Sequence, residues 1–580
     1  MSAEEPSIYE FGNFRLEAEK RLLLRKGAPV PLTPKVFDTL LYLVRHRGKL
    51  VAKNELMRAV WPDTVVEENN LNQNISALRR ILGETRGDNV YIATLPGKGY
   101  QFIPTVEAIA DSAPETSLPV TLAVLPFENL SAQGEREYVA DGLTEEVITA
   151  LGLIDPEHLR VIGRTTMMSY KRTQKTLAQV ADELKATYII ESSMRTEGER
   201  LRITSKLIGV RDHTQLWSMS YDSQPGSILE FQQEMSRNIG EQIRLRLSPE
   251  RMTALARRQS RNAEAYDLYL RGRYFWNQLS SATTKRASSF FQRATQLDPQ
   301  YALAWSGLAD GYTGSPINGD ASPLEVGPLA RDAAAHAVAA DANLAETQTS
   351  LGFVKFWLDW DWLAAESAFR KANLLDPNYS LAHRLLGIVL SHLQRPSEAL
   401  KAIGRARQLD PLLAGHHALS SQIAFSGRDD NAAERFARQS ITIDPEFWIG
   451  YMQLGQALER LGERESALKA LNLAARLSGG NSKAISLRGY ILAGLGRTAE
   501  AREVLSMLET LAKERYVPLY AEALVYAGLG ERYQALDALE RALIVRDVHL
   551  AFLPIDPKWD SFRDEPRFRS LLKACGFGGA

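Results

Sequence analysis

The chain has 580 residues, which is enough for about three or four domains with cores of their own. Its 69 basic and 70 acidic residues nearly cancel, so net charge gives no argument for nucleic acid or membrane binding, and charge must be examined locally. The one cysteine, Cys575, excludes a disulfide framework and a cysteine-ligated zinc site. We find neither a signal peptide nor an apolar run near the roughly 20 residues that a membrane helix needs, and we expect a cytoplasmic protein without membrane contact.

The first domain, residues 1–106, is predicted to hold short strands, then three helices, then a β-hairpin. Turn residues divide the segment 8–30 into short apolar stretches, which is typical of strands. The first helix begins at Thr33-Pro34, a favoured N-cap followed by proline, and the others begin near Lys53 and Glu67. A turn at Pro96–Gly99 joins the two hairpin strands. This order is that of a winged helix-turn-helix, an α+β fold.

The third of these helices carries an amide-rich face. Its apolar residues recur at the spacing of one buried stripe, at Leu71, Ile75, Leu78 and Leu82. The polar side and its flanks carry Asn69, Asn70, Asn72, Gln73, Asn74, Ser76, Ala77, Arg79 and Arg80. Amides pair with adenine in the major groove, and arginine pairs with guanine or phosphate. We therefore expect this face to bind double-stranded DNA, with Lys98 of the hairpin tip on a phosphate or in the minor groove. The alternative is a winged domain that contacts only protein.

Motifs in this domain resemble the effector domain of OmpR/PhoB-type response regulators and of CadC/ToxR-like one-component regulators. The resemblance covers Ile8 to Val106. The matching residues are Leu32-Thr33-Pro34, Phe37, Leu40, Asn54-Glu55-Leu56, Val60-Trp61, Ile75, Leu78-Arg79 and Gly97-Lys98-Gly99-Tyr100. Many relatives have an arginine just before the hairpin glycine, which they use in the minor groove. This chain has Pro96 there, so minor-groove readout would require Lys98 to substitute for that arginine.

The resemblance also implies roles and partners. Base-facing positions would be Asn70, Gln73 and Ala77. Positions that face the DNA backbone would be Trp61, Asn74, Ser76, Arg79, Thr94 and Tyr100. The implied partners are double-stranded DNA, RNA polymerase and a second copy of the chain on the DNA.

Residues 107–119 are polar and are predicted to be a linker, followed by a small α/β domain over 120–248. Its expected strands are 121–126, 159–162, 188–194, 201–210 and 215–221. Its expected helices are centred on 139–151, on 177–184 and on Ile228, Phe231, Met235 and Ile239. This domain resembles the amino-terminal domain of TolB through Ala123–Phe127, Asp141-Gly142-Leu143 and Tyr188–Ser192.

The middle domain shows no constellation typical of an enzyme. We attribute the acidic residues Asp141, Glu145 and Glu146 to the start of a helix, where acids are favoured. His158 and His213 have no partner at ligand spacing, and the chain has neither a phosphate-binding loop nor a nucleophile elbow. We therefore expect no catalytic, cofactor or metal site.

A period of 34 residues marks the third part of the chain, residues 262–547. The dipeptides Asp376-Pro377, Asp410-Pro411 and Asp444-Pro445 recur at that interval. This pattern predicts about eight tetratricopeptide repeats, which form an all-α solenoid. Between Asp298 and Asp341 the spacing is 43, and we expect a loop over 314–323 to absorb the excess. Trp357, Trp360, Trp362 and Trp448 are expected to pack between helices, and residues 548–580 to cap the array.

Together these features predict a multidomain, one-component transcription regulator that binds DNA sequence-specifically. We expect the middle domain and the array to receive the signal as a protein, peptide or small ligand. Two other interpretations are a scaffold whose winged domain docks a protein partner, and an enzyme with an unrecognised site in the middle domain.

Overall fold

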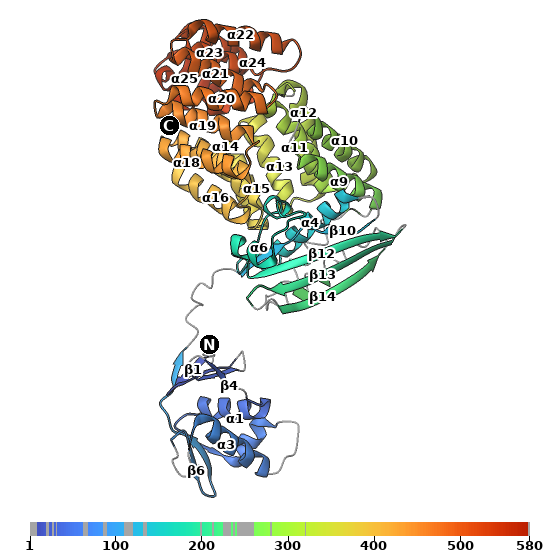
Figure 1. Ribbon diagram of the computed structural model, residues 1–580, viewed down its shortest axis with the longest axis vertical. Coiled ribbons are helices and arrows are strands. Elements are labelled where there is room, and N and C mark those ends of the chain that lie inside the picture. The colour runs from blue at the N-terminus through green and yellow to red at the C-terminus, as the bar shows by residue number, and fades with distance from the viewer. Residues whose placement is uncertain are drawn as a thin grey trace. The chain divides into compact units, whose positions relative to one another are not determined.

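The computed structural model of the chain divides into two compact units, an amino-terminal unit of residues 1–118 and a carboxyl-terminal unit of residues 119–580 (Figure 1). The residues that the structure describes are 8–18, 22–25, 28–30, 32–61, 68–84, 90–109, 120–131, 136–197, 200–211, 214–223, 234–235, 238–239, 260, 262–278, 281–319 and 321–577. The middle domain and the array, which we expected as separate domains, therefore belong to one unit.

The amino-terminal unit contains two antiparallel sheets and three helices. The larger sheet has the strand order β4-β3-β2-β1-β8 and the smaller one β5-β7-β6. The strands are β1 (Ile8–Phe11), β2 (Phe14–Glu17), β3 (Leu22–Arg25), β4 (Ala28–Val30), β5 (Leu50–Ala52), β6 (Ile92–Leu95), β7 (Gly99–Phe102) and β8 (Glu107–Ile109). The helices are α1 (Pro34–Arg45), α2 (Lys53–Val60) and α3 (Glu68–Leu82). The predicted winged helix-turn-helix is confirmed.

One core joins these helices to both sheets. The predicted stripe of α3 is buried, since Leu71, Ile75, Leu78 and Leu82 each expose 2% or less of their surface. Phe11 of the larger sheet meets Phe102 of the smaller sheet edge-on, with 5.1 Å between the ring centroids. The core therefore fixes α3 by its apolar side and leaves its amide-rich side outermost.

Two strands of this unit were not predicted. β5 pairs with the hairpin strand β7, and β8 pairs with β1 although residues 107–119 were expected to be linker throughout. In both pairs, backbone N–H and C=O groups at a sheet edge gain partners from a distant part of the chain. A local polarity pattern does not reveal such a pairing. Thr33 stands at the N-cap of α1 as predicted, but its side chain makes no capping hydrogen bond.

The carboxyl-terminal unit begins with a mixed sheet in the order β11-β9-β12-β13-β14, with β10 beside β12. β9 runs parallel to both of its neighbours, and β12, β13 and β14 are antiparallel. The strands are β9 (Val120–Val124), β10 (Glu128–Asn129), β11 (Leu159–Val161), β12 (Tyr188–Glu197), β13 (Arg200–Gly209) and β14 (Thr214–Ser223). The helices are α4 (Glu137–Gly152), α5 (Arg164–Met168) and α6 (Leu177–Leu184). The α/β order is as predicted, with β10 and α5 in addition.

Part of the predicted middle domain lies outside the described residues. His213 and, in the expected last helix, Ile228 and Phe231 belong to this part. Met235 and Ile239 of the same helix are described, and both are fully buried.

The acidic residues of α4 are not helix-start residues, so that interpretation was wrong. The helix begins at Glu137, and the three acids lie beyond its first turn. Lys171 Nζ lies 2.5 Å from Asp141 Oδ1, and Glu145 is bound by Arg164 and Arg273. These carboxylates are ion-pair partners of neighbouring elements.

The array consists, over the described residues, of eight helical pairs followed by a terminal cap. The pairs are α9 (Ala263–Trp276) with α10 (Ser281–Leu297), α11 (Ala302–Asn318) with α12 (Pro323–Ala340), α13 (Ala345–Val354) and its π-helical extension η2 (Lys355–Asp359) with α14 (Trp362–Leu375), α15 (Ser380–His392) with α16 (Pro396–Leu409), α17 (Ala414–Ser426) with α18 (Asp430–Ile443), α19 (Trp448–Arg460) with α20 (Arg464–Leu477), α21 (Ser482–Gly494) with α22 (Thr498–Ala512), and α23 (Leu519–Gly528) with α24 (Arg532–Ile544). The cap consists of η3 (Val548–Phe552), η4 (Pro557–Phe562) and α25 (Pro566–Ala574).

The predicted loop over 314–323 was mostly wrong. Helix α11 continues through Pro316 to Asn318, and Gly319 ends it with φ +78°. Gly314 and Pro316 are buried in this helix. Tertiary packing therefore outweighs the turn preference of these residues, and the excess over the 34-residue period lengthens α11 and α12 instead.

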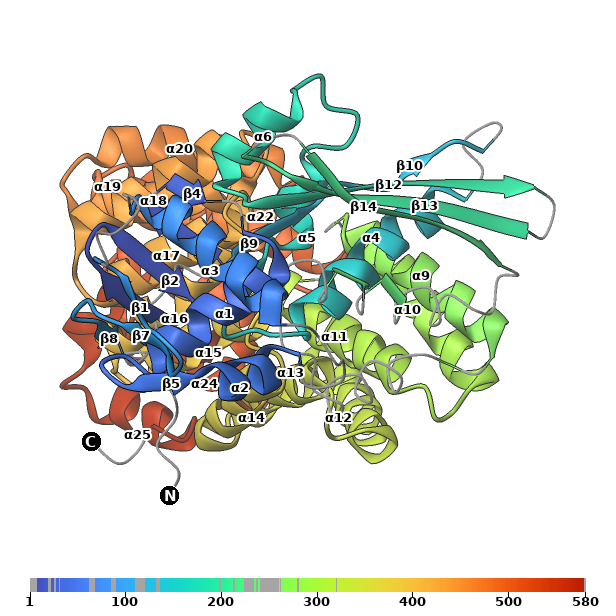
Figure 2. The same cartoon turned by 90° about the horizontal axis from the view of Figure 1, so that it is seen from below.

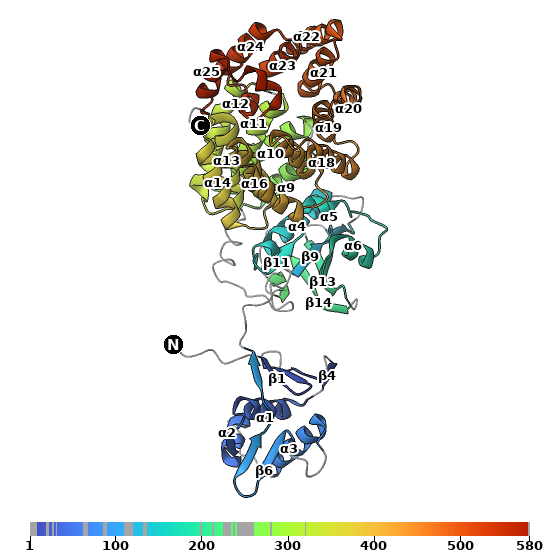
Figure 3. The same ribbon diagram turned by 90° about the vertical axis from the view of Figure 1, so that its left-hand side faces the viewer.

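The cap packs against helices from the middle of the array. The end of the described chain lies beside α14 (Figure 3). There Trp362 of α14 stacks on Phe577 with 4.5 Å between ring centroids, and its Nε1 donates to the Cys575 carbonyl over 3.2 Å. Trp357, Trp360 and Trp362 are buried as predicted, and Trp448 is half-buried. The array therefore coils until its end meets its own earlier turns.

The middle domain binds the array along two surfaces. Helix α4 lies between the mixed sheet and α9 (Figure 2), and Glu145 of α4 pairs with Arg273 of α9. The loop before α5 and α5 itself contact the turn after α16: Gly163 N–H donates to the Leu409 carbonyl over 2.6 Å, and Thr166 N–H donates to Asp410 Oδ1 over 2.6 Å.

The neighbouring Asp-Pro turn makes the same kind of contact. Asn378 Nδ2 donates to the carbonyls of Gly152 and Leu159 over 2.9 and 3.1 Å. Two of the turns that mark the 34-residue period are thus binding sites for the middle domain.

No helix in the described part of the chain combines the length and the apolar character needed to cross a bilayer.

Candidate nucleic-acid interface

Helix α3 presents a row of unengaged polar side chains. Asn70, Gln73 and Arg80 are exposed, and their side chains make no hydrogen bond or ion pair with other described residues. Ser76 is also exposed, and its hydroxyl donates to the Asn72 carbonyl within the helix over 2.8 Å. For Asn69 the structure describes the backbone alone, as part of the helix. Solvent-facing amides without partners are available to a ligand that offers both donors and acceptors.

Other amides of the same helix hold the domain together. Asn72 Oδ1 accepts a hydrogen bond from the Tyr100 hydroxyl over 2.7 Å, and Tyr100 itself is only 4% exposed. Asn74 Nδ2 donates to Thr39 Oγ1 over 3.1 Å and to the Lys35 carbonyl over 3.2 Å. These amides tie α3 to the hairpin and to α1.

Arg79 connects the end of α3 to the hairpin. Its Nη2 donates to the Ile92 carbonyl over 2.8 Å and to Thr94 Oγ1 over 2.7 Å. Its Nε lies 3.4 Å from Glu84 Oε2, and the Glu84 side chain is 1% exposed. Glu84 Oε1 in turn accepts the N–H groups of Tyr91 and Ile92. We call this group of contacts the Arg79–Glu84 clamp.

The remaining predicted residues lie around the same helix and the hairpin. Ala77 is half-buried and packs against the core, while Lys98 is exposed at the hairpin tip. Trp61, at the end of α2, is half-buried, and Lys35 Nζ lies 6.0 Å from its ring centroid.

Gly99 seats the hairpin on β5, because a Cβ there would lie 2.0 Å from the Val51 carbonyl oxygen. The glycine that follows Lys98 is therefore required by a close backbone approach.

The sequence did not single out Lys35. This exposed residue at the start of α1 donates to the Val60 carbonyl over 2.7 Å and lies close to Trp61 and Asn74. Nothing in its sequence position distinguishes it from any lysine in a first helical turn. Only the packing of α1 beside α3 brings a cation to this edge of the helix.

The structure offers no competing metal centre among the residues it describes, because no three His, Cys, Asp or Glu side chains gather there as metal ligands would.

Three family models match the chain. Residues 27–102 match the model described as "Transcriptional regulatory protein, C terminal". Residues 118–238 match "HilA/YgeH-like transcriptional regulator, second domain", and residues 450–481 match "Tetratricopeptide repeat". The three matches fall on the winged domain, on the mixed sheet with its helices, and on the sixth helical pair with its flanks.

Two curated relatives named as transcription regulators and one named as a cyclase also match the chain. "Transcriptional regulator HilA" of Salmonella typhi is 27% identical over 410 residues, which are 70% of this chain and 71% of the relative. "Transcriptional activator CadC" of Escherichia coli is 35% identical over 97 residues, 17% of this chain and 19% of the relative. A Rhizobium meliloti protein named "Putative adenylate cyclase 3" is 32% identical over 200 residues, 34% of each chain.

Proposed function

We propose that this chain, which carries an OmpR/PhoB-type winged helix-turn-helix domain, a HilA/YgeH-like second domain and tetratricopeptide repeats, is a bacterial transcription regulator that binds DNA sequence-specifically. The observation that carries the proposal is the row of exposed, unengaged side chains on α3. Asn70, Gln73 and Arg80 offer the donors and acceptors that base edges and phosphates match.

In this proposal α3 lies in the major groove. Asn70, Gln73 and Ala77 face the bases, and Asn69 and Asn72 flank them. Arg80 and Lys98 contact phosphates, and Lys35 is a further candidate for such a contact. The proposed backbone-facing residues are Trp61, Asn74, Ser76, Arg79, Thr94 and Tyr100. Those among them that are engaged inside the domain also position α3 and the hairpin, so their roles in binding and in stability are coupled.

The carboxyl-terminal unit is proposed to receive the signal. We keep the predicted division into a linker, a middle domain over 120–248, an array over 262–547 and a cap over 548–580, with the linker shortened by β8. The resemblance of the middle domain to TolB stays a prediction. RNA polymerase and a second copy of the chain on DNA are the proposed macromolecular partners, and the cytoplasm, where bacterial DNA lies, is the proposed location.

We propose no catalytic activity. The similarity to the regulator HilA extends over 71% of that protein, whereas the similarity to the cyclase-named relative extends over 34% of it. A protein scaffold whose winged domain docks a partner is the alternative function.

A salt titration of DNA binding tests the proposal. Residues 1–118 form a compact unit with its own core, so this fragment can be used alone. We expect it to bind duplex DNA with an affinity that falls steeply as salt rises, because phosphate contacts release counterions. Arg80→Ala should reduce the slope of log affinity against log salt by about 0.9, the value for one lost phosphate contact.

Arg15→Ala is the matched control. It removes the same charge from β2 and should leave the slope unchanged. Absence of DNA binding under any salt condition would reject the regulator and leave the scaffold. Equal effects of the two arginine substitutions would show that α3 is not the DNA-contacting face.

A further inference from the structure

The inner side of the array contains a cavity of about 340 Å³. The first helices of successive pairs, from α11 to α23, contribute its walls, and the cap contributes residues of η3 and of the start of η4 with the turn before it. Most of the wall is apolar or aromatic, with side chains such as Phe353, Trp357, Ile388, Leu419, Met452 and Leu524. Its volume and its apolar lining are typical of a site for a small molecule. The volume is too small to hold a folded protein partner.

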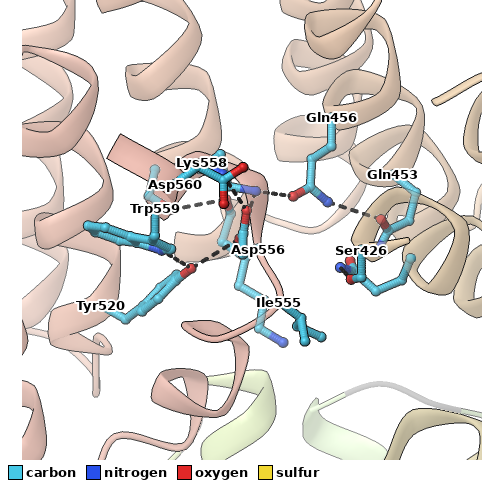
Figure 4. A network of polar contacts seen from close by, with 12 residues as sticks. Ser426, Gln453, Gln456, Tyr520, Ile555, Asp556, Lys558, Trp559 and Asp560 are labelled. Carbon is cyan, nitrogen blue, oxygen red and sulfur yellow. Dashed lines mark hydrogen bonds and ion pairs between the residues drawn. The ribbon is translucent and has the colours of Figure 1, made fainter. Parts of the chain in front are cut away.

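The polar groups of the cap side of this wall bind one another. Lys558 Nζ lies 2.9 Å from Asp556 Oδ2 and donates to Gln456 Oε1 over 2.6 Å (Figure 4). The Tyr520 hydroxyl donates to Asp556 over 3.3 Å and accepts from Trp559 Nε1 over 2.8 Å. The charges on this side are therefore satisfied within the protein.

Arg384 of α15 differs from these residues. It lines the cavity and is half-buried, yet its guanidinium makes no hydrogen bond or ion pair with any described residue. The Asp410 carboxylate stabilises the charge on Arg384 only from beyond ion-pair distance, and it is itself bonded to the Thr166 N–H. The guanidinium lies beside Gly415, where a Cβ would be 3.4 Å from Arg384 Nη1, at ordinary contact distance.

An arginine in such surroundings stays charged, although burial lowers its pKa from the ordinary value. A charge beside an apolar cavity is costly without a counter-charge, and a guanidinium matches a carboxylate with two parallel hydrogen bonds. Because the rest of the wall is apolar, it fits a molecule whose apolar body carries such a carboxylate.

We propose that the cavity binds a small organic anion, with its carboxylate on Arg384 and its apolar body among the aromatic and aliphatic side chains of α13 to α23. Such a molecule would be the signal for the regulator proposed above, a step that rests on that function. The binding itself does not depend on DNA.

Calorimetric titration of the full chain with decanoate, and with 1-decanol as the uncharged analogue, tests this proposal. We expect decanoate to bind the wild-type chain. Arg384→Gln should lower the affinity for decanoate tenfold or more and leave the affinity for 1-decanol unchanged. Arg438→Gln, on the exposed side of α18, is the matched control and should change neither affinity. Ala418→Phe, at a buried position of the wall, should fill the cavity and lower the affinity for both probes.

The proposal is overturned if decanoate does not bind the wild-type chain. It is also overturned if Arg384→Gln lowers the affinities for decanoate and 1-decanol equally, or lowers neither affinity. It is also overturned if Ala418→Phe retains both affinities. Circular dichroism of each variant confirms folding, and should Arg384→Gln not fold, the Ala418→Phe result decides alone. Because no DNA is present, failure here is distinct from failure of the proposed DNA-binding function.

Discussion

Helix α3 contains two kinds of amide side chain. Asn70 and Gln73 are exposed and unengaged, whereas Asn72 and Asn74 are bonded to the hairpin and to α1. The difference arises from a rotation of about 100° per residue, which moves each successive side chain to another neighbour. An amide that is bonded inside the domain stabilises the fold, and one that is free can contact a base.

Gln73→Ala should change which DNA sequence is preferred without changing stability. Loss of a bidentate base contact costs about 1–3 kcal/mol at one position of the site. The free energy of unfolding should change by less than about 0.5 kcal/mol, as is usual for exposed residues without partners. Selection from randomised duplexes, combined with urea unfolding of residues 1–118, measures both quantities.

Asn74→Ala is the comparison for Gln73→Ala. It removes the hydrogen bond to Thr39 and should cost about 1 kcal/mol in stability. An unchanged sequence preference in Gln73→Ala would show that this residue does not contact bases.

At the scale of elements, the Arg79–Glu84 clamp joins α3 to the hairpin. The clamp brings together the two elements that a winged domain uses on DNA, and it places a cation beside a carboxylate that is 1% exposed. Removing the cation leaves that carboxylate without its ion-pair partner in a buried position.

Arg79→Ala should therefore destabilise the amino-terminal unit by about 1–3 kcal/mol, the cost of an unsatisfied buried polar group. Arg80→Ala removes the same charge one residue further along but breaks no contact, so it should leave stability unchanged and weaken DNA binding. Urea unfolding and DNA titration of both variants separate the two effects. Equal stability of the two variants would show that the clamp does not hold the hairpin.

At the scale of the whole molecule, the middle domain and the array share an interface of hydrogen bonds and ion pairs. Residues far apart in the chain meet there, as Asp410 and Thr166 do. Glu145 is also bound there. Burial alone would raise the pKa of this carboxyl, but the guanidinium groups of Arg273 and Arg164 hold that pKa below its ordinary value. The two parts are therefore expected to fold and respond together.

Truncation tests this coupling. A chain of residues 1–261, which lacks the array, should still bind DNA but lose regulated transcription. Its middle domain should be cleaved by protease at sites that are protected in the full chain, because α4 and α5 lose their partners. The fragment of residues 1–118 is the control for DNA binding. A protease-resistant middle domain in residues 1–261 would contradict the coupling, and full regulated output would show that the array is not the input module.

The sequence by itself determined most of the elements and their order, although it did not reveal β5, β8, β10 and α5. Helices, strands and turns depend on preferences that act over short stretches of chain. These preferences are visible as local patterns, such as the apolar spacing in α3, the 34-residue period and the turn residues. For the same reason the predicted loop over 314–323 was wrong: Gly314 and Pro316 favour a turn locally, but burial in α11 outweighs that preference.

Only the tertiary structure decided which polar side chains are engaged. In the sequence Asp410 only marks the repeat, whereas in the fold it binds α5. Arg384 belongs to no sequence motif, and only the structure shows that it lines a cavity. Their partners and surroundings come from elements far away in the chain, brought close by the coiling of the array. A pairing of that kind depends on three-dimensional packing, and no pattern of neighbouring residues encodes it.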